Sequence, residues 1–436
     1  MRSNRPNRQF LIQIFEFFVP ISNPGKVRLP IYGAKVLAVR SGKIDMHGCR
    51  VTTTWTEMNV TGEIGDTNIR LTHPVANDWV AGDKIIIAST GDVMTLHHSE
   101  TAEIAWVSQD GYTLQLTRPL KFRHIAVCSG PWDWAETICH RAEVGLLTRN
   151  VKFSGNVNKQ WVEHLPPCKY GIGTAFGVQT CFQNRFGHEE GSDQFGAQLF
   201  IHKAEYGRLE YVEFNFVGQA FFIGRYATHF HLTGNVGRGN SYLRGSAVHR
   251  SFNRAVTLHA VYNLTIEYNV AYNVMGMCYF IEDGIEEDNL LQYNLAVMVK
   301  KASSMLHVDS IPAAFWITNP NNIWRHNHAA GVTHFGYWFN APRNPTGPSA
   351  TTEICSQCRP LGEFWNNTVH SAGKYGLWVF IQLTPEERIG IGEIPEEVRD
   401  EVPEDTFGLF AWNCERGAEL VTGTYVQVKV ANRNSF

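Results

Sequence analysis

The sequence predicts an all-β protein whose larger part, residues 126–436, is a solenoid of the parallel β-helix type behind a β-rich unit. One observation is a pattern that recurs from about residue 140 onward. An aliphatic or aromatic residue is followed by Asn three positions later and by a small or apolar residue two further on. The other observation is that a segment with period-two alternation follows these copies, which is the side-chain period of a strand. Irregular repeats that grow by loop insertion are typical of solenoids.

Composition excludes several classes of protein. The chain has 436 residues, of which 44% are hydrophobic and 12% aromatic, so it can bury a large core and is not disordered as a whole. Only 18% are charged and the net charge is −3. Such a chain has no basic domain to neutralise a phosphate backbone, so nucleic acid is not an expected partner. No apolar run reaches the ~18 residues that a membrane span requires.

Residues 1–30 are set apart as an N-terminal segment that is not matched to either predicted unit. Basic residues precede the apolar stretch 10–20, as in a signal peptide, but Glu16 interrupts that stretch and no clear cleavage site follows. Two interpretations stay open, a working signal or a misplaced start in a longer protein.

Residues 31–125 are expected to form the β-rich unit. Segments 36–39, 42–45 and 84–88 are rich in β-forming residues, and glycines separate them. No helical periodicity of useful length occurs in this region.

The repeated polar position predicts a ladder inside the solenoid. Identical amides one coil apart would lie ~4.8 Å from each other and could hydrogen-bond along the stack. The alternative is that Asn is merely common in turns. The positions assigned to this column are Asn215, Ser246, Asn269, Asn294, Asn327, Asn367 and Asn413.

A second strand is expected in each coil, at residues 220–225, 255–260, 278–283, 336–341 and 376–381. Alternation places apolar pairs such as Val256 and Leu258 toward the inside of the coil. The opposite face carries an aromatic stripe and then a polar column. Such a stripe either stacks sugar rings or packs beneath another domain. The candidate binding residues on this outer face are Phe222, Phe280, Trp338, Trp378 and Asn340.

A group of titratable residues falls on the same face. His259 and Glu282 are expected in adjacent coils, Asp283 follows directly, and His229 and His231 share one strand face because they are two residues apart. We therefore consider His229, His231, His259, Glu282 and Asp283 as candidate catalytic residues for acid–base chemistry on a polysaccharide. The alternative is a set of hydrogen-bonded surface groups. Glu282 and Asp283 are expected on opposite strand faces, which suits a glycosidase poorly and leaves lyase chemistry open.

Charge and metal ligands complete the candidate site. Arg225 and Arg250 could neutralise a uronate carboxylate if their side chains reach it. His229 and His231 are the metal ligands if the site holds a divalent cation, for which calcium and zinc are both considered.

Nine cysteines are present, and only Cys355 and Cys358 are closely spaced. A structural zinc site needs four ligands, so a loop disulfide or free thiols compete with zinc for this pair.

Several long motifs resemble the fibrocystin and fibrocystin-L family. They are the segments 249–259, 269–276, 280–284, 315–322, 345–352 and 411–418. The related cell-surface hyaluronidase and the cell-migration-inducing, hyaluronan-binding protein share Tyr226 with the His229-Phe-His231 strand, the Glu282-Asp-Gly step and an Asn-Pro-Asn segment. Residues 36–124 resemble the C-terminal part of the family's eight-glycine domain. The resemblance covers roughly residues 36–436.

The resemblance implies a right-handed parallel β-helix behind a partial eight-glycine domain. It further implies a large extracellular glycoprotein at the cell surface or the ciliary membrane, anchored by a membrane span that this chain does not contain. Two functions follow as expectations. One is a receptor-like protein that binds a glycan such as hyaluronan, or an extracellular protein. The other is a hydrolase or lyase that depolymerises hyaluronan or another polysaccharide. The missing domain start suggests a fragment, and the acidic insertion at 382–405 is expected to be a solvated loop.

Overall fold

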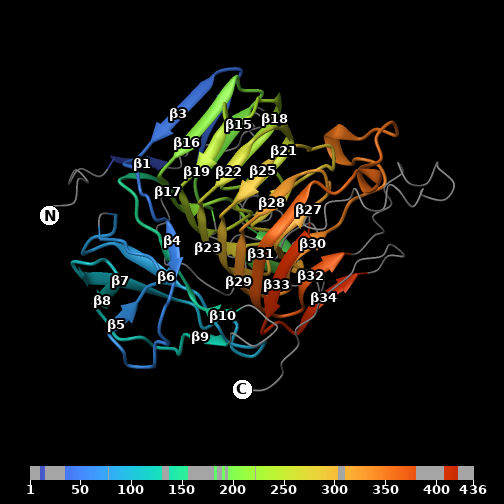
Figure 1. Ribbon diagram of the computed structural model, residues 1–436. Helices are drawn as coiled ribbons and strands as arrows, with labels where there is room; N and C mark the ends of the chain where they lie inside the picture. The colour runs from blue at the N-terminus through green and yellow to red at the C-terminus, as the bar shows by residue number, and fades with distance from the viewer. Residues whose placement is uncertain are drawn as a thin grey trace.

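Parallel strands stack into three columns in the computed structural model (Figure 1). The described residues are 10–14, 35–76, 78–129, 137–155, 181–183, 189–191, 195–220, 222–302, 310–379 and 407–420. Within this part of the chain no α-helix occurs, and no helix is long and apolar enough to cross a membrane. The expected fold class, an all-β parallel β-helix, is confirmed.

Sheet I is a nine-stranded parallel sheet. Its strands, in spatial order, are β2 (Val36–Arg40), β15 (Gln198–His202), β18 (Thr228–Asn235), β21 (Val256–Tyr262), β24 (Tyr279–Ile281), β27 (Ala313–Ile317), β30 (Phe335–Phe339), β32 (Tyr375–Val379) and β34 (Arg416–Leu420).

Sheets II and III belong to one 15-stranded path that doubles back at the long strand β31 (Glu363–Ala372). Sheet II consists of the first part of β31 with β3 (Lys43–His47), β16 (Tyr206–Glu210), β19 (Tyr242–Arg244), β22 (Thr265–Glu267), β25 (Leu290–Gln292) and β28 (Ile323–Arg325). Sheet III consists of the second part of β31 with β1 (Phe10–Ile14), β12 (Val151–Gly155), β17 (Val212–Val217), β20 (Ala247–Ser251), β23 (Val270–Met275), β26 (Leu295–Lys300), β29 (His328–Val332) and β33 (Phe407–Trp412).

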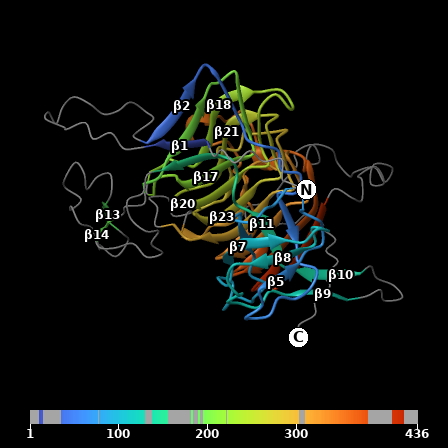
Figure 2. The same ribbon diagram turned by 90° about the vertical axis from the view of Figure 1, so that its left-hand side faces the viewer.

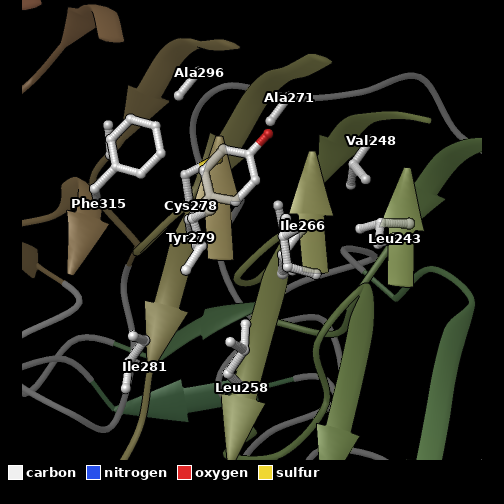
Figure 3. Packing of buried hydrophobic residues seen from close by; sticks show 14 of the residues in the cluster. Leu243, Val248, Leu258, Ile266, Ala271, Cys278, Tyr279, Ile281, Ala296 and Phe315 are labelled. Atoms are coloured by element: carbon white, nitrogen blue, oxygen red, sulfur yellow. The ribbon is translucent and has the colours of Figure 1, made fainter. Parts of the chain in front are cut away.

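The core lies between the three sheets and follows the predicted inward columns. On sheet I, Val256 pairs in register with Tyr279, and Leu258 pairs with Ile281. The Tyr279 ring stacks on Phe315 with centroids 5.0 Å apart (Figure 3). Both rings are fully buried, and removing such area from water is the main favourable term in folding.

A ladder of buried amides runs through the turn between sheets II and III. Asn269 donates from Nδ2 to Oδ1 of Asn294, which donates to Asn327, which donates to Asn367, at 2.9, 3.0 and 3.1 Å. Ser246 occupies the same column one coil earlier, where its backbone N–H donates to Asn269. These five positions confirm the predicted ladder.

Two assigned members of that ladder are wrong. Asn215 lies inside β17 opposite His249, and Val212 holds the position that corresponds to Ser246, because Glu213 pairs with Ala247. Asn413 follows β33, where Leu409 is the residue paired with Asn367. The local pattern was satisfied at both places, but the coils there are set in a different register.

The strand predicted at residues 220–225 is also wrong. The strand of that coil is β18, whose Phe230 faces Leu258 in register and lies in the core. Residues 222–225 instead belong to the connection before β18, where Ile223 is 56% exposed. Phe221 lies outside the described residues.

An antiparallel unit lies between β3 and β12 in the chain and thus interrupts the first coil of the solenoid. Its six-stranded arrangement contains β4 (Trp55–Glu57), β11 (Glu143–Leu146), β6 (Lys84–Ile87), β7 (Glu100–Val107), β8 (Thr113–Leu116) and β5 (Asn68–Arg70). Figure 2 shows this unit, with β5, β7, β8 and β11, beside the stacked strands. A hairpin of β9 (Ala126–Ser129) and β10 (Ile138–Arg141) is closed by the disulfide Cys128–Cys139. We call residues 48–150 the inserted unit.

Strand pairing differs at two points from the expected division of the chain. The sequence placed residues 126–150 in the solenoid, but β11 pairs with β4 and β6 of the inserted unit. The sequence placed residues 31–125 in one unit, but β2 and β3 pair with β15 and β16 and so belong to the solenoid. The division itself stays a prediction. Segments 1–9, 15–34 and 380–406, which include the acidic insertion, lie outside the described residues.

The inserted unit packs on the outer face of sheet III. Ile86 and Ala88 join Val270, Leu295 and other residues of that sheet in a buried apolar cluster. A Cβ on Gly145 would lie 2.8 Å from Val270, so only glycine permits this approach. The smaller elements are the hairpin β13 (Cys181–Gln183) and β14 (Glu189–Gly191), and the 3₁₀ turns η2 (Gly347–Ser349) and η3 (Ser356–Cys358).

Candidate functional site

The candidate residues converge on the outer face of sheet I, where three successive coils contribute β18, β21 and β24. His231 pairs in register with His259, and Glu282 donates its backbone N–H to the carbonyl of Leu258. The His column therefore continues into Glu282, as the sequence predicted. We call His229, His231, His259, Glu282 and Asp283 the histidine cluster.

His259 contacts both carboxylates of the cluster. Its Nε2 lies 2.6 Å from Oδ2 of Asp283, and its Nδ1 lies 3.4 Å from Oε2 of Glu282. The expectation that Glu282 and Asp283 point to opposite strand faces is wrong, because β24 ends at Ile281 and the alternation ends with it. Two carboxylates that share one imidazole do not flank a glycosidic bond in the way that hydrolysis requires.

His229 and His231 complete the group from the preceding coil. Nδ1 of His229 lies 3.3 Å from the carbonyl oxygen of Gly224, and its Nε2 lies 3.6 Å from Oε2 of Glu282. Nδ1 of His231 lies 2.8 Å from Nδ1 of His202 on β15. One potential ligand atom from each of the three histidines lies within 4.8 Å of the others, so this group could hold a metal ion.

Tyr226 and Arg254 hold the other side of Glu282. The hydroxyl of Tyr226 donates to Oε1 of Glu282 at 3.3 Å and accepts from Arg254 Nη1 at 2.8 Å. The guanidinium is buried and lies 3.7 Å from the centroid of the Phe280 ring. A buried cation on an aromatic face is a rigid support.

Burial and neighbouring charges shift the pKa values within the cluster. Burial lowers the pKa of His229, and burial together with the other imidazoles lowers the pKa of His231 to about 3. Burial alone would raise the pKa of Glu282, but His229, Arg254 and His259 outweigh it and lower that pKa to about 2. Burial would lower the pKa of His259, yet its hydrogen bond to Asp283 and both carboxylate charges raise it. At neutral pH, Glu282 is ionised and His231 is neutral.

The cluster is less exposed than the sequence suggested. The side chains of His229, His259 and Asp283 are 2–4% exposed, whereas Glu282 is 16% exposed and His231 is half-buried. The expected open patch bordered by Phe280 and Trp338 is therefore wrong, because both aromatic residues are buried. Solvent reaches the cluster at Glu282 and His231.

The aromatic stripe forms one continuous column beside the cluster. Phe280 pairs with Trp316, which pairs with Trp338, which pairs with Trp378. These rings form a separate apolar cluster with Met277, Ala313 and Phe335, and Trp378 at its edge is half-buried. Of the two interpretations, packing accounts for Phe280 and Trp338, while Trp378 and Asn340 keep partial exposure.

The two candidate arginines have different places. Arg225 is half-buried and adjoins Gly224, whose carbonyl contacts His229, and Phe222 is half-buried in the same connection. Arg250 follows His249 on β20 and lies over the ring of Phe216, on sheet III. The sequence offered Arg250 for the site on condition that its side chain reached it, but Arg250 lies on sheet III and not on the face of sheet I that carries the cluster.

The connection between β30 and β31 covers the Asp283 side of the cluster. The backbone N–H of Ser349 donates to Oδ2 of Asp283, and that of Thr346 donates to the Asp283 carbonyl. Gly347 has a φ of +61° and approaches Oδ1 so closely that a Cβ there would clash. The same connection contains the disulfide Cys355–Cys358, which decides between the alternatives for that pair.

Sequence reasoning missed several members of the site. The ring of Phe200 lies 4.9 Å from that of His229, centroid to centroid, and both Phe200 and His202 precede the recognised repeats. Tyr226 and Arg254 come from the turns before β18 and β21 rather than from strands. Glu286 is fully buried below Asp283, where the backbone N–H groups of Ala260 and Gly284 donate to its carboxylate. Burial still raises the pKa of Glu286 to about 7. Alternation along a strand could indicate which residues share a face and so reach the site together. No sequence pattern indicated which turn residues would reach it.

The part of the chain that forms this site is similar in sequence to known proteins. Residues 194–377, which include the whole histidine cluster, match the CEMIP β-helix family model. The chain is 45% identical to fibrocystin-L of Mus musculus over 406 residues, or 92% of this chain. It is homologous to a part of fibrocystin-L. The chain spans only 9% of the length of fibrocystin-L, and the expected relationship to the fibrocystin family is confirmed.

Two relatives with lower sequence identity to this fibrocystin-L homologue have names that mention hyaluronan. Cell surface hyaluronidase CEMIP2 of Homo sapiens is 29% identical over 70% of this chain and 22% of its own length. The cell migration-inducing and hyaluronan-binding protein of Homo sapiens is 30% identical over 72% of this chain and 24% of its own length. A solved tailspike protein, gp49 of Pseudomonas phage LKA1, aligns with 90% of this chain and 68% of its own. The identity to that protein is 10% and the TM-score is 0.23.

Proposed function

We propose that this chain is part of a receptor-like β-helix protein of the cell surface or extracellular space that binds an acidic glycan of the hyaluronan type. Two relatives are named for hyaluronan, one as a cell surface hyaluronidase and one as a hyaluronan-binding protein. An extracellular protein ligand is the competing partner. A ciliary location stays a prediction from the resemblance.

The observation that carries the proposal is the partly open edge of the histidine cluster. Glu282 and His231 offer polar atoms to solvent while the rest of the cluster is buried beneath them. Phe222 and Arg225, both half-buried, belong to the connection that contacts His229. A uronate-containing sugar has an apolar ring face, hydroxyl edges and a carboxylate, and these side chains provide a partner for each.

A specific observation favours a second function, cleavage of the polymer. His259 is oriented by Asp283, and Tyr226 lies between Arg254 and Glu282, so one compact group contains a candidate base and a candidate acid. In a lyase reaction the base takes the C5 proton of a uronate. The C4–O bond then breaks, and the acid gives its proton to the departing oxygen. Shared contact of both carboxylates with His259 favours this chemistry over hydrolysis.

A binding assay with a cleavage readout tests both functions. The full chain is titrated with hyaluronan of defined length and with dextran, a neutral polymer, in the presence and absence of divalent cations. We expect saturable binding of hyaluronan and weaker binding of dextran. The double variant His259→Ala/Glu282→Ala should lose about tenfold or more in affinity, or about 1.4 kcal/mol.

The matched control is His97→Ala/Glu63→Gln, which changes the same residue types at exposed positions of the inserted unit. It should bind like the parent. Polymer length and the ultraviolet absorbance of an unsaturated uronate are followed in the same samples, since only a lyase produces that absorbance. Equal binding by the parent and the cluster variant would contradict the proposal.

A further inference from the structure

The three histidines of the cluster are arranged so that one nitrogen of each ring is engaged outward and the other faces inward. His229 uses Nδ1 toward the Gly224 carbonyl, at 3.3 Å. A carbonyl only accepts, so Nδ1 carries the proton and Nε2 keeps its lone pair. His259 uses Nε2 toward Asp283, at 2.6 Å, which leaves Nδ1 for the cluster. His231 uses Nδ1 toward His202, at 2.8 Å, which leaves Nε2.

Two atoms that face the centre of the cluster have no hydrogen-bond partner in the part of the chain that the structure describes. Nε2 of His229 belongs to a residue that is 1% exposed, and neither it nor Oε2 of Glu282 is hydrogen-bonded among the described residues. The two atoms lie 3.6 Å apart, too far for a hydrogen bond between them. Nδ1 of His259 lies 3.4 Å from the same carboxylate oxygen. A buried polar atom without a hydrogen-bond partner costs free energy, which indicates that a partner is missing. Where lone pairs face one another, a cation is the partner that suits them.

We infer that His229, His231 and His259 bind a first-row transition metal ion of the zinc class, with Glu282 as a fourth ligand. Imidazole nitrogen suits zinc and its neighbours, whereas calcium and magnesium prefer oxygen-only sites. Of the two cations considered from the sequence, the geometry therefore points to zinc. One ring atom from each of the three histidines lies within 4.8 Å of the other two, so each ring needs to move inward by less than ~1 Å to reach a Zn–N distance of ~2.0–2.1 Å. Oε2 of Glu282 lies 3.6 Å from Nε2 of His229 and 3.4 Å from Nδ1 of His259.

The outward contacts are of the kind that support metal ligands. Histidines that bind metals usually donate their second N–H to a carboxylate, a carbonyl or another fixed group, which sets the ring orientation. Asp283 fills this place for His259, and the Gly224 carbonyl fills it for His229. Asp283 is itself fixed by the backbone N–H of Ser349. Asp283 is thus a positioning residue in this proposal.

The ion and the groups around it would carry a net positive charge that an anion could balance. Glu282 and Asp283 contribute two negative charges and Arg254 one positive charge to the group. A divalent cation would bring the sum to +1. A hydroxide or the carboxylate of a uronate could balance that charge. Metal binding itself does not depend on the proposed glycan function.

The test measures metal alone, without glycan. The full chain is stripped with a chelator, and Zn²⁺ is titrated against a competing chromophoric chelator while bound zinc is counted by mass spectrometry. We expect one tightly bound zinc per chain and no competition from a thousandfold excess of Ca²⁺. His229→Gln/His259→Gln should abolish that binding, and Asp283→Asn should weaken it about 10–100-fold. His97→Ala, at an exposed position, should bind like the parent.

Co²⁺ replaces Zn²⁺ in a second measurement that needs no variant to fold. Four-coordinate Co²⁺ bound by imidazoles gives intense visible absorption, whereas hydrated Co²⁺ gives weak bands. Circular dichroism checks that each variant is folded. The inference is overturned if the folded parent binds no stoichiometric zinc, if it gives no intense Co²⁺ spectrum, or if the folded double variant retains the ion. A failure of hyaluronan binding would leave this result intact, so the two proposals fail separately.

Discussion

Glu143 and His370 are 227 positions apart in the chain, and Oε2 of the first lies 2.8 Å from Nε2 of the second. Glu143 belongs to the inserted unit and His370 to β31 of the solenoid. The other carboxylate oxygen lies 2.8 Å from Nδ1 of His328 on β29. Glu143 and His370 are almost fully buried, so this three-residue contact fixes the inserted unit on sheet III through groups removed from water.

Removal of the Glu143 charge should loosen this junction. Glu143→Gln leaves two buried imidazoles facing an uncharged amide, and breaking a buried pair in this way costs about 3–5 kcal/mol. Urea unfolding should show that loss, and limited proteolysis should cut the inserted unit faster than in the parent. Glu63→Gln is the control, because its ion pair with Arg123 is exposed and its loss should cost less than about 1 kcal/mol. Equal losses in the two variants would contradict the assigned role.

The same contact should give stability a defined pH dependence. Burial would raise the pKa of Glu143, but His370 and His328 hold it well below 4.5, and Glu143 in turn raises the pKa of His328 above 6.5. The Glu143 contribution is present above pH 4.5 and is lost as pH falls. The His328 contribution is complete below pH 6.5 and is lost as pH rises through its raised pKa. The difference in unfolding free energy between parent and Glu143→Gln should therefore peak between pH 4.5 and 6.5 and decline toward pH 9. A flat difference over that range would contradict this assignment.

The amide ladder should be sensitive to single substitutions. Asn294 accepts from the backbone N–H of Asn269 and donates to the carbonyl of Ile266, so Asn294→Ala leaves buried polar groups without partners. We expect a loss of about 2–4 kcal/mol in chemical denaturation. Asn294→Ser should lose less, because Ser246 fills the same column two coils earlier and is hydrogen-bonded there. Asn59→Ala, at an exposed position outside the ladder, is the control and should lose under about 1 kcal/mol.

Asn59 is the expected acceptor of an N-linked glycan if the chain is secreted. It heads the sequon Asn59-Val-Thr61 and is exposed in the inserted unit. The amides of the other two sequons are engaged, since Asn263 donates to Asn235 and Asn366 donates to His326. Asn59→Gln should remove a glycosidase-sensitive mass from protein secreted by eukaryotic cells, and Asn263→Gln should not. Secreted parent protein without such a mass would refute the assignment.

Much of the solenoid was predictable because its coils repeat a local pattern. Asn269, Asn294, Asn327 and Asn367 share a spacing to a buried residue, and each bonds to the next. Asn215 and Asn413 satisfy the same spacing by chance, since register depends on the neighbouring strand and not on the segment itself. Period two likewise placed His229 and His231 together, because a strand fixes that relationship within three residues.

Other parts of the site depended on contacts that no local pattern contains. Tyr226 and Arg254 enter from turns, and a turn residue has no fixed direction until the coils above and below it are in place. The outward-facing aromatic column could be paired by sequence, but its burial depended on what packs over it. Trp316, which lies between Phe280 and Trp338, was missed because its strand was not recognised as a coil.

The position of the inserted unit has a consequence for the order of folding. The first coil cannot close until β12 reaches β17, and β12 follows β3 only after the whole inserted unit. As an unstructured loop, roughly 100 residues would have to be closed against their entropy, which delays non-local contacts. Once β4 pairs antiparallel with β11, however, Trp55 lies opposite Gly145 and the two ends of the insertion are side by side. Only two short connections then remain to be closed. The inserted unit is therefore expected to fold first and to bring β3 and β12 together for the first coil.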